Sequence, residues 1–476
     1  MPDPFERNRS VPHRARTVVG VVAGLAALAG MVPLLAATGL PAVDSVTHYL
    51  IAIAVILMSC QLLAAVARRI GQPPVLGEMV GGLLLGPSLL GAVWPAASAF
   101  LFPSAVVEGL GAAAQLGLVV FVFLLGCELR TDRIERKRVV ATTVAGGMLL
   151  PCVAGAGIVA ATGGLFAGQD GAAPTATMLF VGLALAVTAL PVLARILADL
   201  QLSETRVGTV ALSAAAIGDG GVWLVLAFLL SGQVENGSGW QILLLATALV
   251  LVTVLCVRPL LAAMVRRLES SQSLTVVLVA GAIGYAVLTQ AIQLHPVVGA
   301  FLFGVAMPRN APCVARISQQ LEGFTLIILL PLFFAGVGLS TSVGLLVTAP
   351  SALLALIVLL IAAVVSKMVG AGVGARLAGL PARDAIRLGL LMNCRGVTEL
   401  VVLTIGYQAG LINQLAYTVL VVVAVITTAI TVPLVRRATL NNSDANKDAT
   451  PGAPLAGGSR GTTASDFPVG EVRGRP

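Results

Sequence analysis

Residues 211–228 read ALSAAAIGDGGVWLVLAF, and Asp219 is the only charged residue in this apolar stretch. An ionised Asp at the centre of a membrane helix costs about 2.5–3.5 kcal/mol on insertion scales. A chain tolerates that cost mainly where the charge faces a cavity, a partner or a passing ion. The stretch therefore predicts a polar site buried inside a bundle of lipid-embedded helices.

The composition places the whole chain in the same class. Of its 476 residues, 58% are hydrophobic and only 11% are charged, whereas a soluble domain carries about 25% charged residues. Apolar runs long enough to span a bilayer recur along most of the chain, which predicts an all-α polytopic membrane protein of about 14 (13–14) helices. The predicted spans are 17–39, 47–67, 74–95, 107–128, 139–161, 175–198, 207–231, 240–264, 273–291, 295–308, 324–345, 351–375, 385–409 and 415–435.

The placement of basic residues supports this division. The segments that follow odd-numbered spans contain no Lys or Arg, and the segments at the ends of even-numbered spans contain nearly all of them. By the positive-inside rule, this alternation predicts that both termini are cytoplasmic and that the protein lies in the cytoplasmic membrane. The formal net charge of +8 then reflects contact with an anionic inner leaflet of the lipid bilayer, so nucleic acid is not an expected partner.

The two ends differ in composition from the apolar middle. Residues 1–16 form a short polar lead that we expect to be cytoplasmic, and residues 17–437 form one transmembrane domain. Residues 440–476 are rich in small and polar residues, which predicts a disordered cytoplasmic tail. No glycine-rich dinucleotide motif follows a predicted strand, so no nucleotide-binding domain is expected. The six cysteines lack the spacing of metal ligands, and no cofactor is expected.

Short motifs recur within the transmembrane domain. Pro74-Val-Leu-Gly77 returns as Pro296-Val-Val-Gly299, and Phe123-Leu-Leu-Gly126 returns as Phe333-Phe-Ala-Gly336. The partner helices are an odd number of spans apart, so the two copies cross the membrane in opposite senses. This pattern indicates an inverted-topology repeat, which is common among secondary transporters. The predicted repeats cover about 47–231 and about 273–435.

Two predicted spans carry residues that interrupt a helix. Pro191 removes a backbone donor in the span 175–198. The span 385–409 contains Met392-Asn-Cys-Arg-Gly-Val-Thr-Glu399, which is polar around Asn393 where a span is normally apolar. We therefore predict two discontinuous helices that cross. Unwound backbone at membrane depth is tolerated only where it is buried or lines a cavity, and half-helix ends offer carbonyls to a cation and N–H groups to an anion.

With the motifs quoted above, residues of about 47–437 resemble the monovalent cation:proton antiporter-2 family, the Kef-type and sodium/proton exchanger-like group. The resemblance implies a transporter rather than an enzyme, with a core domain, a dimerisation domain and a homodimeric assembly. Members of the family usually show two adjacent polar or acidic residues before a Trp. Here those positions are Gly218 and Asp219, followed by Trp223, so the first acid is lost. One carboxylate favours a 1:1 electroneutral exchange.

Asp219 is the predicted binding group for either a proton or a cation. Burial favours the neutral acid, and a bare cation supplies the charge that displaces the proton. Thr188 and carbonyl groups of the broken helix can add oxygen ligands. The alternative is that Asp219 is a hydrogen-bonded residue of helix packing. Lys367 matches the intramembrane lysine of the family, which implies a counter-charge for Asp219. The alternative for Lys367 is a side chain that snorkels near the helix end.

Arg395 and Glu399 are spaced i,i+4, so the sequence predicts that they share a helix face and pair. Their predicted role is charge balance at the crossing of the broken helices, and the alternative is a purely structural buried pair. Glu78 lies in the span 74–95, and its role stays open.

Three functions are compatible with this pattern. The leading hypothesis is an antiporter that exchanges Na⁺ or K⁺ for protons by alternating access and serves pH homeostasis. A second hypothesis is a proton-coupled exporter of an organic cation or ionophore, for which Gly218, Gly220 and Gly221 would leave room. A third is a non-transporting regulator of the same fold, which has no need of a costly buried acid.

Overall fold

The computed structural model describes residues 44–128, 136–162, 164–168, 174–231, 239–267, 272–292, 294–308, 311–348 and 350–447. Within these ranges every regular element is a helix. Among the described residues, eleven helices are long and apolar enough to cross a membrane, or up to 12 if a bent pair counts as one span. The predicted all-helical polytopic class is confirmed.

The predicted count of about 14 spans is not confirmed. The first predicted span, 17–39, lies outside the described ranges. The span predicted at 295–308 corresponds to α14 (Pro296–Val305), which has 10 residues. That length is well short of the roughly 20 residues that a spanning helix needs.

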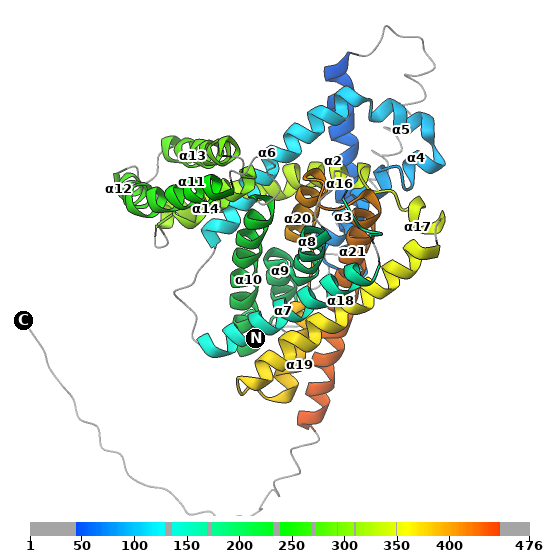
Figure 1. The fold of residues 1–476 in the computed structure, drawn as a ribbon, viewed down its shortest axis with the longest axis vertical. Coiled ribbons are helices and arrows are strands. Elements are labelled where there is room, and N and C mark those ends of the chain that lie inside the picture. Colours follow the sequence, from blue (N-terminus) through cyan, green and yellow to red (C-terminus); the bar gives the residue numbers. More distant parts are fainter. Residues whose placement is uncertain are drawn as a thin grey trace, which may run out of the picture.

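One group of helices, here called the scaffold bundle, lies in the upper half of Figure 1. Within it α3 packs against α2 and α16, while α14 packs against α6 and α13. A long apolar helix with a π-helical turn flanks this bundle as α11 (Gly239–Val252), η1 (Thr253–Val257) and α12 (Arg258–Arg267). The scaffold bundle comprises α2 (Ser45–Arg69), α3 (Pro74–Leu85), α6 (Ser104–Glu128), α13 (Gln272–Ala291), α14 (Pro296–Val305) and α16 (Leu330–Leu339).

The remaining long helices form a second group, here called the core bundle, in the middle and lower part of Figure 1. It is built around α7 and α18, which pack along each other and contact α8 and α19 respectively. Its members are α7 (Lys137–Ala161), α8 (Pro174–Ala186), α9 (Leu190–Asp199), α10 (Arg206–Ser231), α18 (Pro350–Leu377), α19 (Ala382–Met392), α20 (Val397–Gln408) and α21 (Gln414–Lys447).

Five short elements complete the described fold. They are α4 (Leu90–Val93), α5 (Pro95–Leu101), α15 (Pro312–Phe324), the π-helical turn η2 (Thr325–Leu329) and α17 (Gly344–Thr348). Of these, α4 and α5 join α3 to α6, α15 and η2 join α14 to α16, and α17 alone leads from the scaffold bundle to the core bundle. The last core helix, α21, continues beyond the predicted end at 435 as far as Lys447. The predicted lead 1–16 and residues 448–476 of the predicted tail lie outside the described ranges.

Two glycine contacts in the scaffold bundle are related by the predicted inverted repeat to within one residue. Gly82 matches Gly304, whereas Phe334 is the residue after the one that matches Phe123. A Cβ on Gly82 of α3 would lie 2.1 Å from the carbonyl oxygen of Phe334 in α16. A Cβ on Gly304 of α14 would lie 2.2 Å from the carbonyl oxygen of Phe123 in α6. Only glycine permits backbones to approach this closely. Because the motif matches set α3 and α6 opposite α14 and α16, this shared packing supports the repeat, whose boundaries stay a prediction.

Both predicted helix breaks are present in the core bundle. The first separates α8, which ends at Ala186, from α9, which begins at Leu190. The second separates α19 from α20, and the two halves are bent by 47°. The prediction that Pro191 itself breaks the helix is wrong in detail. Pro191 lies in the first turn of α9, where its missing N–H would have no helical partner anyway, and the unwound residues precede it.

Candidate functional site

The two unwound segments meet inside the core bundle and are joined by direct hydrogen bonds. The Ala189 N–H donates to the Cys394 carbonyl over 3.1 Å. The Thr188 hydroxyl donates to the Met392 carbonyl over 3.0 Å. The crossing therefore brings together the C-terminal ends of α8 and α19 and the N-terminal ends of α9 and α20. Helix ends carry partial charges, positive at the N-terminus and negative at the C-terminus.

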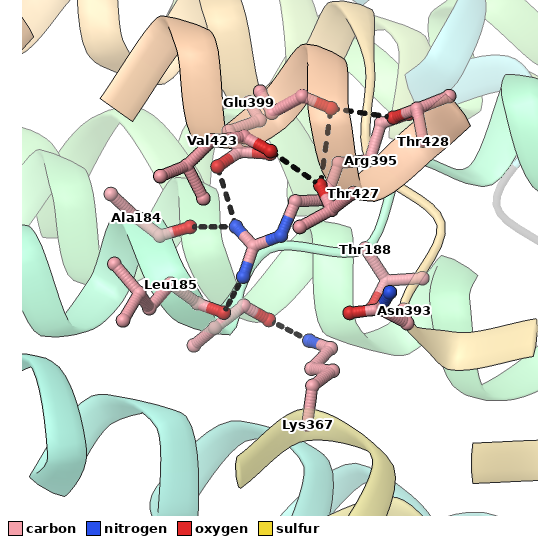
Figure 2. Close-up of polar contacts among 12 residues, drawn as sticks. Ala184, Leu185, Thr188, Lys367, Asn393, Arg395, Glu399, Val423, Thr427 and Thr428 are labelled. Atoms are coloured by element: carbon pink, nitrogen blue, oxygen red, sulfur yellow. Dashed lines mark hydrogen bonds and ion pairs between the residues drawn. The ribbon is translucent and has the colours of Figure 1, made fainter. Parts of the chain in front are cut away.

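Two cationic side chains occupy the C-terminal end of α8 (Figure 2). The Arg395 guanidinium donates to the Ala184 carbonyl over 3.0 Å and to the Leu185 carbonyl over 2.7 Å. The Lys367 ammonium donates to the Ala186 carbonyl. The last carbonyls of a helix have no partner within the helix, and of these three only that of Ala184 also accepts a described backbone N–H, from Val187 over 3.4 Å. The two cations therefore complete the hydrogen bonding and oppose the negative end of the helix.

Lys367 is 1% exposed and points into the crossing. The alternative of a snorkelling lysine is therefore wrong, because a snorkelling side chain places its ammonium in water. The side chain instead ties α18 to the broken segment after α8.

Arg395 and Glu399 form the predicted pair, with Nη1 and Oε1 2.5 Å apart and both side chains fully buried. The expectation that they share a helix face is wrong. Arg395 lies in the unwound segment 393–396, and α20 begins only at Val397. Glu399 occupies the first turn of α20, where a carboxylate is favoured by the positive helix end.

Asp219 lies on α10 and is 3% exposed. Its carboxylate accepts the N–H of Leu190, the first residue of α9, over 3.4 Å. The positive end of α9 thus faces an acidic side chain. Trp223 follows one turn later on the same face of α10, and its ring lies 6.4 Å from the ring of Phe301 in the scaffold bundle. This face of α10 therefore turns toward the seam between the bundles.

The C-terminal end of α19 differs from the other three half-helix ends in its partners. The hydroxyl of Thr188 contacts the Met392 carbonyl, and Asn393 Nδ2 donates to the Thr431 hydroxyl over 3.3 Å. Within the described part of the chain, the buried Asn393 Oδ1 has no hydrogen-bond partner. This end therefore collects neutral oxygen atoms and no cationic side chain among the described contacts.

Three consecutive residues link these oxygen atoms to the acid. Thr188 contacts Met392, Ala189 contacts Cys394, and Leu190 contacts Asp219. One carboxylate, a threonine, an amide oxygen and helix-end carbonyls are the hard oxygen ligands that alkali cations take. The arrangement can hold a single monovalent cation at the C-terminal end of α19, which, unlike that of α8, has no cationic side chain among its described contacts.

The threonines of α21 that support the crossing were not predicted from the sequence. The Thr428 hydroxyl donates to the Arg395 carbonyl over 2.8 Å, and the Thr431 hydroxyl donates to the Asn393 carbonyl over 3.4 Å. All are buried. The sequence feature that could have indicated them is a cluster of hydroxyl residues, Thr427, Thr428 and Thr431, within the apolar span 415–435.

Glu78 lies apart from the crossing, in a cavity of about 540 Å³ at the seam between the bundles. Arg68 and Glu322 also line the cavity, as do Pro191 and Val397, which lie in the first turns of α9 and α20. Glu78 is therefore an ionisable side chain of the cavity beside the crossing, and it does not contribute a ligand at the crossing itself.

Comparisons with known proteins agree with this architecture. The sequence profile described as "Sodium/hydrogen exchanger, transmembrane" matches residues 53–437. The chain is 37% identical over 405 residues to Cation/H(+) antiporter 19 of Arabidopsis thaliana, covering 80% of this chain and 48% of that protein. It is 35% identical over 397 residues to the Na(+)/H(+) antiporter NhaS4 of Synechocystis sp., covering 80% of this chain and 95% of that protein. The chain thus spans about half the length of the plant relatives it matches.

Among solved structures, the sodium proton antiporter MjNhaP1 of Methanocaldococcus jannaschii is similar with a TM-score of 0.64. The alignment covers 85% of this chain and 99% of that chain at 13% sequence identity. This likeness shows the shared fold.

Proposed function

The chain belongs to the sodium/hydrogen exchanger family of monovalent cation:proton antiporters and is a multi-pass membrane protein, and we propose that it exchanges Na⁺ or K⁺ for protons. The observation that carries this proposal is the buried carboxylate of Asp219 at the N-terminus of α9, next to a helix end that offers only neutral oxygen ligands. We propose that Asp219, Thr188 and Asn393 contribute to the ion site.

Exchange follows from competition for one carboxylate. A buried carboxyl group is favoured in its neutral, protonated form because an isolated charge is poorly solvated there. A bound cation supplies the missing positive charge and displaces the proton. Asp219 therefore carries either a proton or a cation in each crossing of the membrane, which couples the two fluxes.

A single carboxylate supports a 1:1 electroneutral exchange. The first position of the family's pair is Gly218, and a Cβ there would meet only the Met148 sulfur, at 4.0 Å. The space at Gly218 would thus admit a larger side chain, so crowding is not the reason that a second acid is absent there. We propose that each cycle moves one cation against one proton.

Alternating access would arise from movement of the core bundle past the scaffold bundle. The cavity of about 540 Å³ at the seam supports this, since it reaches the first turns of α9 and α20 from one side. We propose that the scaffold bundle forms a homodimer in the cytoplasmic membrane and that both termini face the cytoplasm, as the distribution of Lys and Arg indicates.

The experiment that tests the proposal is proton flux in everted vesicles that contain the full chain. A proton gradient is established, and Na⁺, K⁺ and Li⁺ are added in turn. Dissipation of the gradient by one or more cations, with a rate that does not change when a membrane potential is imposed, is the expected result. No response to any alkali cation would contradict cation exchange, and a voltage-dependent rate would contradict the 1:1 stoichiometry.

Lys367→Gln is expected to change the pH dependence of exchange more than the maximal rate. The glutamine amide can still donate to the Ala186 carbonyl, but the positive charge beside the crossing is gone. The measurement is the exchange rate against pH, with Lys367→Arg as the control that keeps the charge. An unchanged profile in Lys367→Gln would assign Lys367 to packing alone.

Thr188→Val is expected to weaken the apparent affinity for the cation about tenfold, because one oxygen ligand is replaced by a methyl group of similar shape. The matched control is Thr177→Val. Thr177 lies on α8, is buried like Thr188, and likewise donates to a backbone carbonyl, that of Leu411, over 2.8 Å, but it is outside the crossing. Cation dependence of the exchange rate distinguishes the two, and an equal loss of affinity in both variants would show that Thr188 acts only through stability.

One observation favours a second candidate function, the proton-coupled export of an organic cation. The seam cavity is lined largely by apolar side chains, including Phe121, Leu124 and Leu125. Its volume of about 540 Å³ falls in the range of sites for small organic ligands. Proton release by a lipophilic cation, without any response to alkali cations, would favour this function.

A further inference from the structure

A second, smaller pocket of about 260 Å³ lies next to the seam cavity, where the corner between α2 and α3 meets α9 and α21. Three arginines from three different helices line it, Arg68 of α2, Arg195 of α9 and Arg436 of α21, together with one acid, Asp199. The formal charge of these four side chains is +3 − 1 = +2. The pocket is therefore a concentrated positive site at the rim of the cavity.

Only one of these arginines has an ion-pair partner among the described residues. Arg195 Nε lies 3.5 Å from Asp199 Oδ1 within α9, and both side chains are about half exposed. Arg68 and Arg436 form no described ion pair. Two guanidinium groups with free donors thus face the pocket from opposite bundles, Arg68 from the scaffold bundle and Arg436 from the core bundle.

The corner that carries this pocket is fixed in place. Gln72 Nε2 donates to the Ala429 carbonyl of α21 over 3.0 Å. Gly71 adopts φ +74°, and a Cβ there would lie 2.5 Å from Arg436 Nη1. The Arg436 guanidinium therefore rests directly on the backbone of the corner, and a side chain at Gly71 would displace it.

We propose that this pocket binds a phosphate group, either of an anionic phospholipid headgroup or of free phosphate. The planar fork of arginine matches a tetrahedral oxyanion with two parallel N–H donors, and such charge-assisted hydrogen bonds are roughly twice as strong as neutral ones. The distribution of basic residues places all three arginines at the cytoplasmic face, where both sources of phosphate are present.

Bound phosphate would connect the two bundles. A group held at once by Arg68 and by Arg436 opposes any sliding of the core bundle past the scaffold bundle, so phosphate occupancy slows exchange. This second step rests on the proposed function, whereas the binding itself does not.

The test uses the purified full-length chain and two probes. The melting temperature is measured in detergent against inorganic phosphate, with chloride at equal ionic strength as the reference. It is then measured with added phosphatidylglycerol against phosphatidylcholine. The variants are Arg68→Gln and Arg436→Gln, and the matched controls are their exposed neighbours Arg69→Gln and Arg437→Gln, which do not line the pocket.

Stabilisation by one probe is expected in the parent chain and both controls, with the half-saturating concentration raised about tenfold in Arg68→Gln and Arg436→Gln. A response to inorganic phosphate assigns the free anion, and a response to phosphatidylglycerol alone assigns the lipid headgroup. Equal responses in pocket and control variants, or no response to either probe, would overturn the site. Because melting does not depend on transport, this outcome is separate from a failure of exchange. Binding that leaves the exchange rate unchanged would overturn the slowing of exchange.

Discussion

Asp219→Asn is expected to abolish cation-dependent proton flux while the protein stays folded. Asparagine has nearly the same shape, and its amide oxygen can still accept the N–H of Leu190 at the start of α9. It cannot exchange a proton for a cation, because it neither ionises nor carries charge. Flux in everted vesicles should fall to the level of membranes without the protein, while the yield and elution volume of the purified protein stay unchanged.

The matched control for this variant is Asp384→Asn. Asp384 lies in the first turn of α19, at the opposite end of a broken helix from the crossing, so its loss should leave exchange intact. Full activity in Asp219→Asn would remove the carrier role from Asp219, and the two carboxylates that line the seam cavity, Glu78 and Glu322, would then have to be examined in its place.

Arg395→Met is expected to prevent stable folding, the largest structural effect of any single change at the crossing. The substitution removes the donors to Ala184 and Leu185 and leaves Glu399 as a fully buried charge without its partner. Breaking a buried pair in this way typically destabilises a protein by about 3–5 kcal/mol. The measurement is the melting temperature and the monodisperse yield of the purified protein.

The double variant Arg395→Met/Glu399→Met is the test of that explanation. If the isolated charge of Glu399 causes the instability, removing it recovers part of the melting temperature, since a well-packed apolar pair often replaces a buried ion pair at little cost. A double variant as unstable as the single one would show that the bonds to the α8 carbonyls are the essential contribution of Arg395.

The parts of the site that were predictable have signals in the local sequence. A lone carboxylate in an apolar run identified Asp219, and a polar run in the middle of a span identified the break near Asn393. The sequence also paired Arg395 with Glu399. The prediction that Arg395 lies on a helix was wrong, because i,i+4 spacing does not reveal that α20 begins only at Val397.

The unpredicted parts depend on contacts between distant segments. Thr431 supports the crossing, yet its hydroxyl also bonds to the carbonyl of Thr427 in its own helix, as threonines commonly do in apolar helices. The clustering of Thr431 with Thr427 and Thr428 marks the region, but the sequence does not show which of these hydroxyls reaches the other broken segment. Pro191 was a correct sign of a break, but a proline is tolerated in the first turn of a helix, so it marks the start of the second half and not the unwound residues.

The hydrogen bonds from Ala189 to Cys394 and from Thr188 to Met392 tie the two broken helices to each other. If the site faces the two sides of the membrane in turn, as proposed, its ligands on the two broken helices would move together and keep the same arrangement. An ion would then bind with equal intrinsic affinity from either compartment. The transporter would then run equally well in either direction, and the concentration gradients of the cation and of the proton alone would set the direction of exchange.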